Sequence, residues 1–112
     1  MAKYETELVG DIVDIMKKIE AGICSGSATA TLEDGSNFSS YGHGARCAVR
    51  VFERYSYLGG NRVSLSVTLF EVDGRVRLSA ITSGGSQAMF LKFNTFGEEA
   101  FLKKLIEIVE NL

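Results

Sequence analysis

Residues 45–83 alternate between apolar and polar positions with a period of two, the pattern of strands that are buried on one face. Turn-forming segments divide this stretch into three predicted strands: Ala45–Tyr57, Val63–Val72 and Arg75–Ser83. Because the connecting segments are short, we expect the strands to form an antiparallel meander. This meander is the predicted centre of the fold.

The Asp73-Gly74 dipeptide predicts a tight turn between the second and third of these strands. Both central residues of a type I′ turn have positive φ, a conformation that aspartate and glycine adopt more readily than most residues. This turn pairs Val72 with Arg75 and therefore places Leu69 opposite Leu78.

The connection between the first and second strands favours a three-residue loop over Leu58–Gly60, with glycine at the left-handed position. Such a loop pairs Tyr57 with Asn61 and places Val51 opposite Val67. A slip of one residue would move a whole strand to the other face, so the agreement between the two turns supports this register. The predicted inner face consists of Val49, Val51, Val63, Leu65, Val67, Leu69, Val76 and Leu78.

The outer face of this predicted meander combines arginine and aromatic side chains with a middle column of serine and threonine. Protein interfaces are enriched in arginine and aromatic residues and depleted in lysine. Every arginine of the chain lies between Arg46 and Arg77, and every lysine lies outside that span. The candidate interface comprises Arg50, Phe52, Arg54, Phe70, Arg77 and Ile81.

The N-terminal part of the chain predicts a strand followed by an amphipathic helix. Ala2–Val9 alternates like a strand, and Asp11 is a favourable N-cap residue for the helix that follows. The buried stripe of this helix consists of Ile12, Ile15, Met16, Ile19 and Ile23. After the helix, Ala28–Leu32 predicts a strand, and a tight turn at Asp34-Gly35 returns the chain as a short strand over Ser36–Ser40.

The C-terminal part predicts a last strand and a closing helix. Gln87–Phe93 is apolar and strand-like, and Thr95 and Glu98 have the spacing of a capping box. The helix is predicted over Phe96–Asn111, and its core-facing residues are Phe101, Leu105, Ile108, Val109 and Leu112.

These elements predict one α+β domain over residues 1–112, with an N-terminal and a C-terminal helix packed on one face of a curved antiparallel sheet. The order of strand, helix, four to six strands and helix resembles the TATA-binding-protein-like or helix-grip arrangement. That resemblance implies a sheet that wraps the C-terminal helix, and helix-grip proteins often hold an apolar ligand between the two.

Several segments also carry a resemblance to a known family: Arg46–Tyr57, Gly59-Gly60-Asn61-Arg62, Ile81-Thr82-Ser83-Gly84-Gly85-Ser86 and Asn94-Thr95-Phe96-Gly97-Glu98-Glu99. Over essentially the whole chain, the sequence is similar to short Firmicutes proteins grouped only as a domain of unknown function. The resemblance implies a small bacterial intracellular domain, and it supplies no catalytic residues.

Charge and hydropathy limit the partners and the cellular location that we expect for the protein. The formal net charge of −2 gives no general attraction to nucleic acid or acidic membranes. The start of the chain lacks the apolar region of a signal peptide, and no apolar run approaches the roughly 20 residues that cross a bilayer. We therefore expect a cytoplasmic protein without membrane contact, in which Cys24 and Cys47 are free, buried thiols.

The residues with catalytic or metal-binding chemistry form no recognised motif. His43, Cys24 and Cys47 lack the spacing of a zinc site, and a nucleophilic cysteine needs a base and an orienting group. Ser83-Gly84-Gly85-Ser86 lacks the lysine and the following helix of a phosphate loop, so a glycine bulge is the simpler interpretation. We predict no catalytic residue, metal or cofactor.

These observations favour a non-enzymatic interaction domain that forms a homodimer through the candidate interface. One alternative is a pocket for a small apolar ligand between the sheet and the C-terminal helix, near Glu53, Tyr55, Tyr57 and Thr82. A further alternative is the binding of nucleic acid or an anion, with arginines on phosphates. The acidic net charge makes nucleic acid the less favoured partner.

Overall fold

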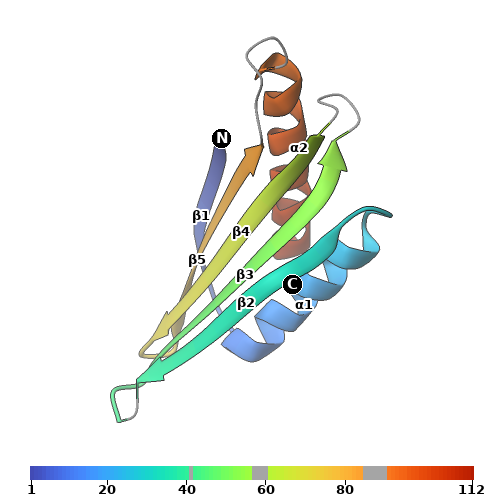
Figure 1. Cartoon of the computed structure of the whole chain (residues 1–112). Coiled ribbons are helices and arrows are strands. Elements are labelled where there is room, and N and C mark those ends of the chain that lie inside the picture. Colours follow the sequence, from blue (N-terminus) through green and yellow to red (C-terminus); the bar gives the residue numbers. More distant parts are fainter. Residues whose placement is uncertain (41, 57–60, 85–90) are drawn as a thin grey trace.

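The computed structural model describes residues 1–40, 42–56, 61–84 and 91–112 of the chain. In chain order the elements are β1 (Ala2–Leu8), α1 (Ile12–Ser25), β2 (Thr31–Ser40), β3 (Ala45–Ser56), β4 (Asn61–Val72), β5 (Arg75–Gly84) and α2 (Leu91–Glu110). The strands form an antiparallel sheet in the order β1-β5-β4-β3-β2 (Figure 1). This confirms the predicted α+β class with an antiparallel sheet and a helix near each end.

Both helices lie against the same side of the sheet, which we call the inner face; the other side is the open face. α1 contacts β2, β3 and β4, whereas α2 contacts β1, β4 and β5, and the helices also contact each other. Figure 1 shows both helices behind the sheet, so the described elements leave the open face uncovered. The largest fully buried side chains are Phe52, Phe101, Ile19, Ile23, Leu65, Leu69, Leu78, Leu105, Val63, Val67 and Val76.

Helix α1 begins and packs as its sequence pattern predicts. The Oδ2 atom of Asp11 accepts hydrogen bonds from the backbone N–H groups of Val13 at 3.0 Å and Asp14 at 3.2 Å. These bonds satisfy donors that the first turn of a helix leaves without intrahelical partners. The predicted stripe is buried as a whole: Ile12, Ile15, Met16, Ile19 and Ile23.

The hairpin between β4 and β5 also confirms its prediction. Asp73 has a φ of 52° and Gly74 a φ of 78°, so both central residues of the turn lie in the left-handed region. Val72 pairs with Arg75, and Leu69 lies opposite Leu78. A local turn signal was sufficient here because the two-residue connection determines the register directly.

The predicted register between β3 and β4 is wrong by one residue. Ser56, rather than Tyr57, pairs with Asn61, so the connection runs from 57 to 60, outside the described residues. Val51 consequently lies opposite Ser66 instead of Val67. Because successive side chains of a strand alternate between faces, this shift moves every side chain of β3 to the other side of the sheet.

The exposed fractions confirm this reversal of β3. The side chain of Phe52, which the sequence analysis placed on the outer face, is 0% exposed in the core. Val49 and Val51, predicted to be inner, lie on the open face instead, and Ala48 and Phe52 supply the buried apolar side chains of this strand. The arginines Arg50 and Arg54 therefore also lie on the inner face.

The predicted strand over Ala28–Leu32 is confirmed only for Thr31 and Leu32, and Ser36–Ser40 is a strand as predicted, but the predicted turn at Asp34-Gly35 is wrong. Residues 31–40 form one strand that pairs along β3, with a bulge between Leu32 and Asp34. Gly35 is not part of a turn. It allows the side chain of Arg50 to pass close to the backbone of β2, since an added Cβ would lie 2.6 Å from the Cδ atom of Arg50. A β3 strand of 12 residues offers a long edge for pairing, and this pairing outweighs the local turn signal of the dipeptide.

The C-terminal helix begins earlier than predicted. α2 starts at Leu91, so residues 91–93 of the predicted last strand are helical, whereas residues 87–90 lie outside the described part of the chain. Thr95 is therefore inside the helix and is not its N-cap. Short apolar runs cannot be assigned to strand or helix by periodicity alone, which explains the error.

Glu98 has a tertiary role in place of the predicted capping box. Its carboxylate is buried, accepts a hydrogen bond from the backbone N–H of Gly84 at 3.0 Å and pairs with the N-terminal amine of Met1. Glu98 thus ties α2 to the end of β5 and to the start of β1. Of the residues predicted to face the core, Phe101, Leu105 and Val109 are buried, Ile108 is partly buried and Leu112 is exposed.

Candidate functional site

The structure divides the predicted arginine and aromatic interface between the two faces of the sheet. Phe70, Arg77 and Ile81 lie on the open face, as expected. Arg50, Phe52 and Arg54 lie on the inner face, because the register of β3 is shifted. The six residues therefore do not form one surface.

Arg50 fastens helix α1 to the sheet. Its Nε atom donates to Glu20 Oε1 of α1 at 2.6 Å, and its Nη1 atom donates to the carbonyl oxygens of Ser36 at 3.2 Å and Val49 at 2.8 Å. The side chain lies across Gly35, so one guanidinium connects α1, β2 and β3. This engagement assigns Arg50 a structural role on the inner face.

Arg46, four residues earlier on the same strand, is similarly engaged. Its Nη2 atom lies 2.8 Å from Glu71 Oε1 and 3.1 Å from Asp11 Oδ1. Glu71 and Asp11 raise the pKa of the Arg46 guanidinium through these hydrogen bonds. The hydrogen bond from Arg46, followed by the backbone N–H of Asp14, lowers the pKa of the Asp11 carboxyl.

Arg54 contacts the other helix. Its guanidinium carbon lies 4.7 Å from the ring centroid of Phe101 on α2, within the range of a cation–π contact. Burial lowers the pKa of the Arg54 guanidinium. The spacing of four residues places Arg46, Arg50 and Arg54 on one side of β3, where they contact the helix cap, α1 and α2 in turn.

The open face carries an apolar patch in place of the predicted mixed surface. Cross-strand pairing aligns Phe38, Cys47 and Phe70 in one row across β2, β3 and β4. Phe38 is 65% exposed and Phe70 is 45% exposed, values far above those of the core. With their neighbours on the same face they define the apolar patch: Phe38, Cys47, Val49, Val51, Phe70 and Ile81.

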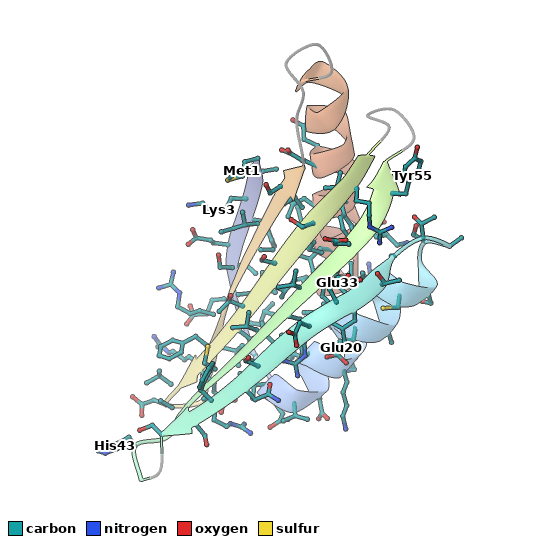
Figure 2. All side chains as sticks on the ribbon, viewed as in Figure 1. Met1, Lys3, Glu20, Glu33, His43 and Tyr55 are labelled. Carbon is teal, nitrogen blue, oxygen red and sulfur yellow. The ribbon has the colours of Figure 1, made fainter. Side chains whose placement is uncertain are left out.

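Uncharged hydroxyl residues complete the centre of the open face, and charged residues surround it. Ser66, Thr68 and Ser79 lie among the residues of the apolar patch. The charged residues are Lys3, Glu5 and Glu7 on β1, Arg75 and Arg77 on β5, Asp34 on β2, and Glu53 and Arg62 at the far end. Figure 2 shows Lys3 at one lateral edge of the sheet and Glu33 on β2, at the other. The result is an uncharged centre within a rim that contains both signs of charge.

The residues predicted to line an apolar pocket do not converge. Glu53 pairs with Arg62 on the open face, where Arg62 Nε lies 2.9 Å from Glu53 Oε1. Tyr55 is exposed on the same face, whereas Thr82 is buried on the inner face. Tyr57 lies outside the described residues. The structure therefore gives no shared cavity for Glu53, Tyr55 and Thr82.

A groove lies elsewhere, between α1 and the inner side of β2 and β3. Its volume is about 420 Å³, within the range of small-molecule sites. Ile12, Met16 and Ala48 contribute apolar side chains, and Arg46 and Arg50 flank Ala48 along β3. The sequence analysis missed this groove because it depends on the reversed register of β3, which places a small alanine beneath the helix.

The cysteines and the histidine occupy separate places. Cys24 is exposed on α1 and Cys47 is partly buried on the open face; both are free, and neither is the buried thiol that was predicted. His43 is exposed in the turn between β2 and β3, and Figure 2 shows it at the opposite end of the sheet from Tyr55. In the described ranges, no three His, Cys, Asp or Glu side chains are grouped closely enough to hold a metal ion.

The described part of the Ser83–Ser86 segment forms the end of β5. Ser83 and Gly84 pair with Ser64 and Val63 of β4, and residues 85 and 86 lie outside the described residues. The predicted glycine bulge therefore lies partly outside the described residues.

Comparisons with known proteins place the chain in a family without assigning it an activity. Neither described helix has the length and hydropathy of a membrane-spanning segment. No curated protein and no solved structure matches the chain. A family described as a family of unknown function matches residues 1–112, so the chain belongs to DUF6054.

Proposed function

We propose that this protein is a non-enzymatic interaction domain that self-associates through the open face of its sheet. The observation that carries the proposal is the apolar patch, whose Phe70 and Phe38 side chains are exposed in the single chain. Monomeric proteins rarely leave large contiguous apolar surfaces in water. A second copy is the partner that would cover this patch.

The distribution of charge on the open face supports a second copy as the occupant. Interfaces typically have a core depleted in charge and a polar rim, and the open face has this organisation. The rim contains acids such as Glu5 and Glu7 together with bases such as Arg75 and Arg77. Two copies related by a two-fold axis can therefore bring unlike charges together at the rim.

The size of the open face is also adequate for a dimer. A strand of 12 residues, the length of β3, extends about 40 Å at roughly 3.3 Å per residue. Five strands span about 19 Å at roughly 4.8 Å per spacing, so the face covers at most about 750 Å². Two stacked faces would bury on the order of 1,500 Å², within the usual range for specific complexes.

The test compares two apolar side chains of equal exposure. Phe70→Asp places a charge in the apolar patch, whereas Leu112→Asp changes a residue at the helix side; the two native side chains are 45% and 43% exposed. Sedimentation velocity of Phe70→Asp is expected to show smaller species than wild type, with unchanged circular dichroism. Leu112→Asp should sediment like wild type. If wild type and Phe70→Asp have the same mass, the open face is not the interface.

The groove between α1 and β3 supports a second candidate function, the binding of a small amphipathic molecule. Its apolar part would contact Ile12, Met16 and Ala48, and an anionic group would lie near Lys17, which also lines the groove. The groove's two arginines already pair with acidic side chains. This site replaces the predicted pocket beside the C-terminal helix. Native mass spectrometry of freshly purified protein should then show a reproducible adduct.

Two matched variants test this candidate: one adds a larger side chain inside the groove, and the other adds the same side chain outside it. Ala48→Leu adds volume inside the groove and should abolish the adduct, whereas Ala21→Leu, at an exposed position of α1, should retain it. A protein that carries no adduct in repeated preparations would count against ligand storage. An adduct that survives in Ala48→Leu would place the ligand elsewhere.

Nucleic acid is the less favoured partner. Arg46, Arg50 and Arg54 are engaged on the inner face, so they are not positioned to contact phosphates across the open face. The bases that remain on the open face are interspersed with Glu5, Glu7 and Glu53. This mixed charge gives little of the counterion release that drives nucleic-acid binding.

We further propose a bacterial, cytoplasmic location and a structural relationship to the TATA-binding-protein-like or helix-grip arrangement. The element order of strand, helix, four strands and helix in the described residues supports the relationship. The resemblance to Firmicutes proteins supports the location.

A further inference from the structure

Strand β2 is an edge strand with little protection. It pairs with β3 on one side and forms the end of the strand order in the described sheet. All ten of its residues are exposed, and Figure 1 shows it along the border of the sheet. The outer edge of such a strand presents backbone N–H and C=O groups that can pair with another strand.

The two edges of the sheet differ in how they discourage such pairing. Edge strand β1 carries the charged residues Lys3, Glu5 and Glu7 along its length. In β2 the acids Glu33 and Asp34 lie at the bulge, and the following segment, Ser36–Ser40, contains neither charge nor proline. Charges, proline and bulges are the devices that blunt an edge, so one half of β2 lacks them.

The Ser36–Ser40 segment is complementary to itself. In an antiparallel pair with Phe38 on the two-fold axis, Ser36 lies opposite Ser40 of the second copy, and Asn37 lies opposite Ser39 of the second copy. No like charges meet within this segment, because Glu33 and Asp34 lie beyond its end. The two Phe38 side chains are directly opposite on the open face, an arrangement that favours cross-strand aromatic contact.

We propose that β2 pairs antiparallel with β2 of a second copy, centred on Phe38, and so joins two sheets into one. The pairing would extend the row of Phe38, Cys47 and Phe70 across the axis into the same row of the partner. It uses backbone groups at the sheet edge, so it goes beyond the stacking of open faces and does not depend on it. A second copy fits as the partner because pairing about Phe38 places serine opposite serine and phenylalanine opposite phenylalanine, with no like charges opposed.

Disulfide trapping tests the contact and its register together. The parent variant carries Cys24→Ser and Cys47→Ser, which remove the native thiols, and Phe70→Asp, which removes the open-face contact. Ser36→Cys and Ser40→Cys are each added to separate parents, since both positions are exposed. Directly paired residues have Cα atoms roughly 4.5–5.5 Å apart, within the range that a disulfide spans.

The proposal predicts that an equimolar mixture of the two variants forms disulfide-linked dimers under mild oxidation. Either variant alone should remain largely uncrosslinked. In the proposed pairing, the same position in the two copies is offset by four residues, which places the two cysteines about 13 Å apart along the strands. Circular dichroism of both variants checks that the fold is retained.

Crosslinking of the mixture no faster than that of each variant alone would overturn the edge pairing. Rapid crosslinking of Ser36→Cys with itself would also overturn it, since that result requires a different register. Both outcomes leave the open-face proposal standing, because that contact is removed in the parent variant and is tested by Phe70→Asp alone.

Discussion

At the scale of single residues, the inner-face arginines show that a residue type common in protein interfaces can instead stabilise the fold. Arg50 donates to Glu20 and to two backbone carbonyl groups, and its path across β2 requires Gly35. Arginine suits this position because its planar group offers several donors in a rigid geometry. The same residue type on the open face, such as Arg77, is exposed.

Gly35→Ala should destabilise the protein. The added Cβ would lie 2.6 Å from Arg50 Cδ and 2.9 Å from the Val49 carbonyl oxygen, so the arginine must move. Such steric insertion typically costs about 1–3 kcal/mol. Urea denaturation measures the loss, and Ser36→Ala at the neighbouring exposed position is the control, expected within about 0.5 kcal/mol of wild type. Equal stabilities of the two variants would show that Arg50 does not depend on Gly35.

Asp11 should contribute to the acid sensitivity of the fold. Because the folded state lowers the pKa of the Asp11 carboxyl, its contribution is present above the unfolded value of about 4 and is lost as pH falls through the lower folded value. Asp11→Asn keeps an N-cap side chain but removes the charge. The free energy of unfolding of Asp11→Asn should therefore fall less between pH 5 and pH 3 than that of wild type, a comparison that denaturant titrations can make. Parallel curves would contradict this assignment.

At the scale of elements, the register of β3 decides which of its side chains lie on the open face. A shift of one residue exchanges the two faces of this strand, so Phe52 joins the core while Cys47, Val49 and Val51 join the open face. The turn at Asp73-Gly74 determined its hairpin, whereas the longer connection at 57–60 allowed more than one register. The apolar patch could therefore be identified only after the pairing of β3 was known.

A pair of alanine variants tests this register. Phe52→Ala should lower the free energy of unfolding by about 3–5 kcal/mol, since the side chain is 0% exposed. Phe70→Ala, at a side chain that is 45% exposed, should change the stability of the single chain by no more than about 0.5 kcal/mol. Chemical denaturation at low protein concentration measures both values. The register first expected from the turns predicts a small loss for Phe52→Ala, so that result would contradict the pairing described above.

At the scale of the whole molecule, the helices and the sheet form two layers with one uncovered side. Such a domain buries one core between the layers, and its open face is then available for partners. The groove and the β2 edge lie on the opposite flank from β1, where charged residues alternate along the strand. The molecule is thus asymmetric: the groove and the unprotected edge lie at β2 and β3, and the apolar patch extends from β2 to Ile81 of β5.

Self-association should make the thermal stability of the protein depend on its concentration. Binding between folded copies stabilises the native state by mass action, so the Tm of wild type is expected to rise with protein concentration. Phe70→Asp should show a smaller rise, because it weakens the open-face contact. Calorimetry over a hundredfold concentration range makes this comparison, with Leu112→Asp as the control. A Tm of wild type that is independent of concentration would contradict association in solution.

The sequence by itself determined the elements whose signals are local. The N-cap at Asp11 and the buried stripe of α1 follow from helical spacing, and the β4–β5 hairpin follows from its two-residue turn. The α+β class and the strand at Ala2–Leu8 were equally accessible, since alternation over a short segment specifies a strand. That this strand lies at the edge of the sheet follows only from the pairing.

The tertiary structure decided what depends on pairing between distant segments. β2 is one strand because β3 offers it a long edge, and Gly35 is required by the Arg50 side chain that crosses it. The start of α2 at Leu91 likewise replaced a strand that the apolar pattern alone could not distinguish from a helix. The apolar patch on the open face also depends on the pairing of distant segments. A shift of one residue in register exchanges the two faces of a strand, and only packing against the helices determines which face is buried.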